Sequence, residues 1–287
     1  MLSRIFTIAY NTFTELVRQK IFYIILVFAV AAIGSSVYFS KVVVVAQEFE
    51  MLKSTCLGAM SFFTILLAIL ATANFLPKDL EDRTIYTLLA KPVPRFAYLF
   101  GRLGGMLAML FLFTLIMSAV FCATLWFREH TALADLQIQY KGAPAEQLAG
   151  EIKQVTDATF NANLIPGILI IFINAAVLAA MTLLVSTFSS SMLFTVMISA
   201  AIYIIGLMQA TAREVWTDGV SVKWYITILT GIIALVFPDM QAFNLSDDVI
   251  AGAALPWNVF FATFGLGWLY VAVYATVSAF VFSGREL

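Results

Sequence analysis

The chain of 287 residues is 62% hydrophobic and only 11% charged, whereas soluble globular proteins have about 25% charged residues. This composition leaves too little polar surface to cover a water-soluble core, so it excludes a soluble globular protein and predicts a multi-pass membrane protein. The net charge of −1 also excludes a nucleic-acid partner, which would require a basic face.

Residues 1–20 are predicted to form an amphipathic helix that lies along the bilayer surface. Apolar residues recur at helical spacing, and Arg4, Arg18 and Lys20 would reach toward the lipid headgroups. The alternative is that this segment extends the first membrane span into the cytoplasm.

Six apolar runs reach the roughly 20 residues that a helix needs to cross the hydrocarbon layer. They predict one all-α domain over residues 1–287, a polytopic bundle of six transmembrane helices. The runs are Ile21–Ser40, Cys56–Leu76, Leu103–Phe127, Leu164–Phe188, Met192–Ala212 and Leu255–Phe282.

The most charged short stretch, residues 78–102, separates the second and third spans. Its acidic start would complement the exposed N–H groups of a new helix, and Pro92 and Pro94 would end that helix. Gly101, Gly104 and Gly105 would permit close helix packing in the third span. The residues alone leave two interpretations open: a rigid surface helix that transmits force to both spans, or a solvated loop.

Two further segments belong to none of the six spans. The polar segment 128–163 is predicted to lie on the other side of the membrane. Its short amphipathic helix, with Leu148, Ile152, Val155 and Thr159 on one face, would cap the bundle or shape a substrate exit. Tyr225–Phe237 is too short to span and favours a re-entrant half-helix, although extension back through Lys223 would allow a full span.

The distribution of basic residues predicts the orientation. With six spans, both termini and the 78–102 loop share one side, which carries nine basic residues, five of them in that loop. Because short cytoplasmic loops are enriched in lysine and arginine, both termini are expected in the cytoplasm. The nine residues are Arg4, Arg18, Lys20, Lys78, Arg83, Lys91, Arg95, Arg102 and Arg285.

The sequence DLEDRTIYTLLAKPVPRFAYLFGRLGG resembles the signature of ABC-transporter permeases of the second export class. Arg83 departs from the family pattern, which often has glycine there, and FPDMQAFNLSDD resembles the region before the family's last span. The matching positions are Asp79, Glu81, Thr84, Leu88, Leu89, Pro92, Val93, Arg95, Gly101 and Arg102.

The resemblance implies a permease subunit in the cell's inner (plasma) membrane that exports a substrate or extracts it from the bilayer. A separate ABC ATPase subunit would bind ATP and magnesium and dock on the loop, and a second copy or a related permease would complete the pathway. The turn 186–191 would be a further contact or only a polar turn. The expected ATPase contacts are Asp79, Glu81, Asp82, Arg83, Thr84, Leu88, Leu89, Lys91, Pro92 and Arg95.

This chain itself is expected to bind no cofactor or metal and to carry no catalytic residue. It has no GxxxxGK[ST] phosphate-binding loop, so the energy would come from its partner. Asn174 and Gln209 lie within predicted spans, where they would contact a substrate or join neighbouring helices. A membrane scaffold without a transport path and an intramembrane enzyme are the alternatives. The single histidine and the lack of paired acids within spans disfavour the enzyme.

Overall fold

A computed structural model describes residues 2–40, 45–75, 77, 94–139, 145–160, 163–189, 191–217, 237–243 and 256–284. Every regular element in these ranges is a helix, and six helices are long and apolar enough to cross a membrane. The predicted all-α polytopic bundle is therefore confirmed.

The spanning helices follow the predicted apolar runs and extend several of them. The helix of the fourth run has the predicted bounds. The helices of the second and third runs begin earlier than predicted, and the helix of the third run also ends later. The spanning helices are α2 (Lys20–Ser40), α3 (Val45–Ala73), α6 (Arg95–Gln139), α8 (Leu164–Phe188), α9 (Met192–Thr217) and α12 (Trp257–Ser283).

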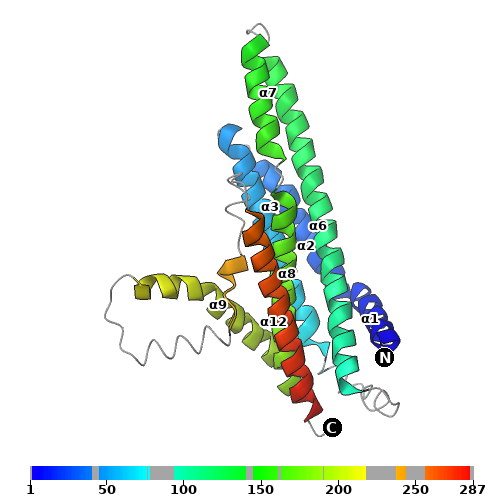
Figure 1. Ribbon diagram of the computed structural model, residues 1–287. Helices are drawn as coiled ribbons and strands as arrows, with labels where there is room; N and C mark the ends of the chain where they lie inside the picture. The colour runs from blue at the N-terminus through cyan, green and yellow to red at the C-terminus, as the bar shows by residue number, and fades with distance from the viewer. Residues whose placement is uncertain are drawn as a thin grey trace.

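Helix α8 forms the centre of the bundle, with α3, α6 and α12 packed around it (Figure 1). It is apolar on every side, which is typical of a fully buried helix, and 83% of its span is buried. The small residues Ala175, Ala176, Ala179 and Ala180 are all completely buried. On the α12 side, a Cβ at Gly267 would lie 2.4 Å from Ile173 Cγ1, so α8 and α12 pack closely there.

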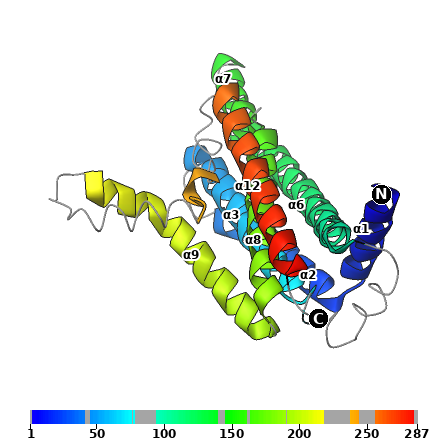
Figure 2. The same cartoon turned by 60° about the horizontal axis from the view of Figure 1, so that its bottom comes forward.

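Helix α9 diverges from this bundle, and its later turns leave the other helices (Figure 2). Only 22% of its span is buried, and Leu193, Met197 and Met208 are largely exposed. Residues Phe237–Phe243, which include the short 3-10 helix η1 (Gln241–Phe243), pack against α9 and α8. Of the predicted half-helix, only Phe237 falls within the described residues.

Helix α1 (Leu2–Val17) is separate from α2, because the chain turns at Arg18 and Gln19. It is therefore not a simple extension of the first span. Its principal partner is the beginning of α6. Phe6 and Tyr10, one turn apart, stay exposed and are available for the predicted contact with the bilayer.

Helix α6 is 45 residues long, about 67 Å at 1.5 Å per residue, twice the roughly 30 Å of a bilayer's hydrocarbon core. Beyond the bundle it forms an antiparallel hairpin with α7 (Ala145–Thr159) (Figure 1). The predicted amphipathic helix is thus present. It packs on the extension of α6 and on α3, with Val155 and Thr159 buried.

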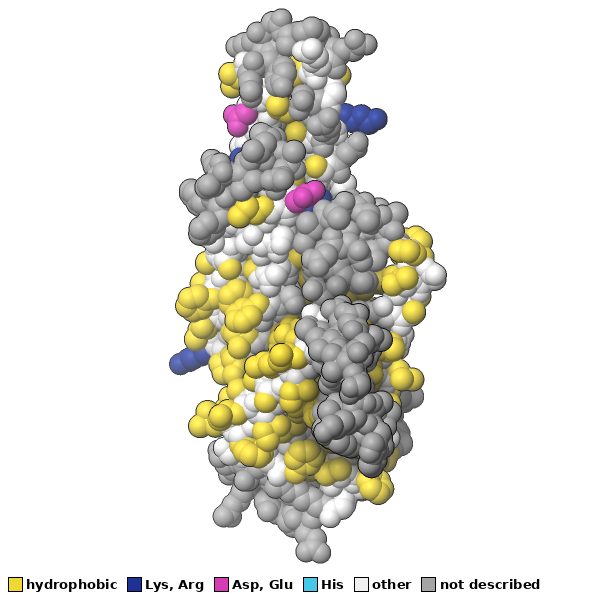
Figure 3. Space-filling model, turned by 90° about the vertical axis from the view of Figure 1, so that its left-hand side faces the viewer, with side chains coloured by type: hydrophobic (Ala, Val, Ile, Leu, Met, Phe, Trp, Pro, Cys, Tyr) yellow, Lys and Arg dark blue, Asp and Glu magenta, His cyan; other side chains and the backbone are white. Residues whose placement is uncertain are grey.

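The types of exposed side chain also differ between the middle of the molecule and the hairpin. On the face shown in Figure 3, hydrophobic side chains dominate the middle of the molecule, while most visible acidic and basic side chains lie toward the hairpin end. Helix α1, the start of α6 and the end of α12 lie together at the opposite end (Figure 1). A multi-pass membrane protein with both ends of the described chain on one side accounts for this distribution.

Candidate functional site at the base of the charged loop

The structure describes the attachment of the charged loop rather than its tip. Of the predicted ATPase contacts, only Arg95 lies within the described residues. Those outside are Asp79, Glu81, Asp82, Arg83, Thr84, Leu88, Leu89, Lys91 and Pro92. The described part of the site is therefore the base of the loop, which consists of Phe75, two residues beyond the end of α3, and residues 94–105 at the start of α6.

Helix α6 begins directly after the prolines of the loop. The carbonyl oxygen of Pro94 accepts hydrogen bonds from the N–H groups of Ala97 (2.9 Å) and Tyr98 (3.3 Å). Proline suits this position because its fixed φ angle fits a helix start and the first N–H groups have no helical partner. The helix thus begins one residue after Pro94.

Arg95 fastens this start to the end of α12. Its guanidinium donates hydrogen bonds to the carbonyl oxygens of Ser283 (2.9 Å) and Phe282 (3.4 Å). A cation near the last carbonyls of a helix is favourable, because it complements both their unpaired acceptors and the helix dipole. The ring of Tyr98 stacks on Phe282, with centroids 6.2 Å apart. The residue predicted to contact an ATPase therefore also joins two transmembrane helices.

Arg102 joins α6 to α1 and to Phe75, just beyond the end of α3. It forms an ion pair of 2.8 Å with Glu15 although its side chain is only 11% exposed. The guanidinium carbon lies 5.2 Å from the centroid of the Phe75 ring and 5.7 Å from that of Tyr98, within the range of cation–π attraction. The sequence marked Arg102 as part of a motif but gave no sign that Glu15 is its partner.

Glycines on α6 allow α1 to approach the same turns. A Cβ at Gly101 would lie 2.7 Å from Ile8 Cβ, and one at Gly105 would lie 2.4 Å from the carbonyl oxygen of Ala9. Both separations are too short for any side chain, so these positions require glycine. The predicted close packing is confirmed, and the packing partner is α1.

The two polar residues predicted within spans have different surroundings. The side-chain amide nitrogen of Gln209 donates to the carbonyl oxygen of Phe237 (2.8 Å), and the N–H of Met240 donates to Gly206 (3.2 Å). Gln209 thus holds residues 237–243 against α9. Asn174 is buried in α8, and among the described residues its Oδ1 atom has no hydrogen-bond partner.

A second polar cluster, which the sequence did not reveal, lies where α3 meets the α6–α7 hairpin. Arg128 forms an ion pair with Glu48, and each side chain is only 8% exposed. Lys53, also buried, donates to the carbonyl oxygen of Ala158 in the last turn of α7. The clue in the sequence was that Glu48 and Lys53 are among three charged residues just before an apolar run, but the partners of these two come from distant segments.

Neither cluster has the composition of a metal site, because the described ranges contain no group of three or more His, Cys, Asp or Glu that could hold an ion.

Comparison with protein-family models and with curated proteins finds no match to this chain. At the loop's base, contacts from one short segment of α6 reach α1, α12 and Phe75 just beyond α3.

Proposed function

We propose that this chain is the membrane-spanning permease subunit of an ABC exporter, driven by ATP hydrolysis in a separate subunit. The observation that carries this proposal is the attachment of the charged loop. Arg95 and Arg102 lie two turns apart on α6. Arg95 bonds to α12 and Arg102 bonds to α1, so a displacement of the loop would displace α6, α12 and α1 together. The resemblance within residues 79–102 supplies the class of partner.

In this proposal an ABC ATPase subunit, with bound ATP and magnesium, docks on the loop from the cytoplasm. Closure of two ATPase subunits moves the docked loops and changes the packing of the spans, as rigid bodies move at other allosteric interfaces. A second copy of this chain, or a related permease, completes the path, and cargo leaves the cell or the bilayer. The chain lies in the plasma membrane with both termini in the cytoplasm, where ATP is present.

One observation favours a second candidate, a membrane scaffold without a transport path. The centre of the described bundle is filled by α8, whose span is 83% buried and mostly apolar. A scaffold would leave ATP turnover by the partner unchanged when this chain is removed. A permease would alter that turnover.

The docking proposal is tested by Glu81→Lys, which reverses a charge in the loop without touching its base. Arg95 is less suitable, because its replacement would also remove the hydrogen bonds to α12. The tagged chain is purified from its own membranes, and the co-purified ATPase is identified by mass spectrometry and assayed for ATP hydrolysis. We expect Glu81→Lys to reduce the bound ATPase about tenfold, the equivalent of 1.4 kcal/mol.

The matched control is Asp135→Lys, the same change of charge at an exposed position of α6 in the hairpin. It should leave the bound ATPase unchanged, because the hairpin lies at the opposite end of the molecule (Figure 1). Equal recovery of ATPase with both variants, or recovery of no ATPase with the unaltered chain, would contradict the proposed docking.

A further inference from the structure

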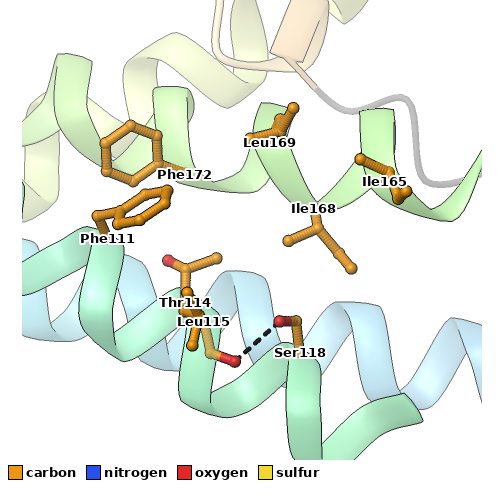
Figure 4. A pocket seen from close by; sticks show the side chains of 8 residues that line it. All are labelled: Phe111, Thr114, Leu115, Ser118, Ile165, Ile168, Leu169 and Phe172. Atoms are coloured by element: carbon orange, nitrogen blue, oxygen red, sulfur yellow. Dashed lines mark hydrogen bonds between the residues drawn. The ribbon is translucent and has the colours of Figure 1, made fainter.

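An apolar groove lies between α6 and α8. Its volume is about 200 Å³. Figure 4 shows Phe111 of α6 facing Phe172 of α8, with Ile168 and Leu169 of α8 farther along. The rings of Phe111 and Phe172 meet edge to face, with centroids 5.5 Å apart. These rings close one end of the groove.

The groove offers no free hydrogen-bond donor to a polar ligand. Its two hydroxyl groups are already used within α6, because Thr114 donates to the carbonyl oxygen of Leu110 and Ser118 donates to that of Leu115. The other six lining residues are hydrocarbon side chains. A polar ligand would lose its hydrogen bonds to water and could regain only those accepted by two hydroxyl oxygens, which is costly, so the groove favours a hydrocarbon occupant.

The position of the groove along α6 places it within the acyl-chain layer. Trp126 stacks on His130, with ring centroids 5.9 Å apart, and tryptophan is enriched where the membrane meets water. Ser118 and Phe111 lie about 12 and 22 Å from Trp126 along the helix, at 1.5 Å per residue. Half of a hydrocarbon core is about 15 Å thick, so the groove lies across the middle of the bilayer, with Ser118 in the half nearer the hairpin and Phe111 beyond the midplane.

We infer that this groove binds an acyl chain of a bilayer phospholipid. The groove is continuous with the lipid-facing surface of both helices, since Phe111, Leu115 and Ile165 at its margin are 50%, 51% and 69% exposed. A helix of a second protein is about 10 Å wide and would not enter a space of this size. Trp126 lies on the same face of α6 as Leu115, where its N–H can donate to a lipid head. The inference does not rest on the proposed function, because it needs only that α6 and α8 cross a membrane.

The inference is tested with the full chain in phosphatidylcholine vesicles that contain a small fraction of phosphatidylcholine with a diazirine in its acyl chain. After irradiation, the labelled residues are located by mass spectrometry. We expect labelling to concentrate on Phe111, Leu115 and Ile168. Phe280 of α12, although more exposed at 79%, should be labelled less.

Ser118→Phe fills the groove and should lower its labelling about fivefold, because the acyl chain loses its van der Waals contacts there. Ser118→Ala removes the hydroxyl without filling the space and should leave labelling unchanged. Labelling of Phe280 in both variants verifies that they are inserted and folded. Labelling that follows exposed area alone, or that persists in Ser118→Phe, would overturn the inference, as would protein cross-links at the groove without any lipid adduct.

Discussion

A single charged side chain, Arg102, connects α6 to α1 and to the segment just beyond α3 near one end of the bundle. Its guanidinium pairs with Glu15 on α1 and lies over the rings of Phe75 and Tyr98. Arginine suits this role because its planar, weakly hydrated group can form an ion pair and stack on aromatic rings at once. The sequence indicated which of these residues are charged or aromatic. It could not indicate that residues 15, 75 and 102 meet, because their contact depends on how three separate segments pack.

At the residue scale, the glycines of α6 give the sharpest test of α1 packing. Gly105→Ala would place a methyl group 2.4 Å from the Ala9 carbonyl oxygen and 3.0 Å from the Phe13 nitrogen. Both are backbone atoms of α1, so the helix must move away. We expect a loss of about 1–3 kcal/mol in the free energy of unfolding, as for overpacked cores, measured by denaturant titration in detergent.

Gly265→Ala is the matched control, since no atom lies within 4 Å of a Cβ built there. Both substitutions exchange glycine for alanine within a helix, so any change in helix propensity is shared. Gly265→Ala should therefore be neutral or slightly stabilising. Equal stability of the two variants would show that α1 does not pack on Gly105.

At the scale of elements, α6 is the helix whose length the sequence least revealed. The apolar run predicts 25 residues, Leu103–Phe127, because hydropathy detects only the part that lies in hydrocarbon. The observed helix, Arg95–Gln139, continues at both ends. Beyond Phe127 it is stabilised by contacts that no local pattern encodes, namely the pairing of Arg128 with Glu48 and the packing of Ala132 and Leu136 with Val155 of α7.

The ion pair between Glu48 and Arg128 should therefore hold the hairpin to α3. Glu48→Gln leaves the arginine charged and buried without its counter-ion, a change that costs about 3–5 kcal/mol in comparable buried pairs. We expect faster hydrogen exchange at the backbone amides of α7 and a lower thermal midpoint.

The double variant Glu48→Gln with Arg128→Gln removes both charges and should recover much of that loss, because no buried charge is left unpaired. Lys153→Gln, at an exposed position of α7, is the control for a single charge removed from the hairpin. If Glu48→Gln behaves like Lys153→Gln, the pair contributes little and the hairpin is held by apolar contacts alone.

At the scale of the whole molecule, the six spans follow from the apolar runs of the sequence. Long apolar runs must cross the bilayer as helices because backbone groups need internal hydrogen bonds there. Helix α8 is apolar on all sides, which is typical of a buried helix. The divergence of α9 and the protruding hairpin did not follow, because they depend on which surfaces find partners. Apart from Arg95, the residues that would contact an ATPase lie within 79–92, outside the described ranges, so that part of the site stays a prediction.

The orientation of the bundle is testable with single cysteines in a chain whose Cys56 and Cys122 are replaced by alanine. Cysteine is placed at Asp135 or Thr156 in the hairpin, and at Asn11 or Ser283 at the other end; all four positions are exposed. A membrane-impermeant maleimide added to intact cells should label only the two hairpin positions. Asn11 and Ser283 should react only after the membrane is permeabilised, as the basic-residue distribution predicts.

Each other outcome has a distinct meaning because the two ends of the chain are tested separately. Labelling of Asn11 and Ser283 in intact cells, with the hairpin protected, would show that the bundle has the opposite orientation. The charged loop would then lie outside the compartment that supplies ATP. That result would contradict the proposed function but not the fold. Labelling of only one of the two would contradict the six-span arrangement itself, since an even number of crossings must leave both ends on one side. The contacts at the base of the loop also require Asn11 and Ser283 to react alike. The hydrogen bonds from Arg95 to the end of α12 and the ion pair from Arg102 to α1 hold both ends of the described chain beside that base.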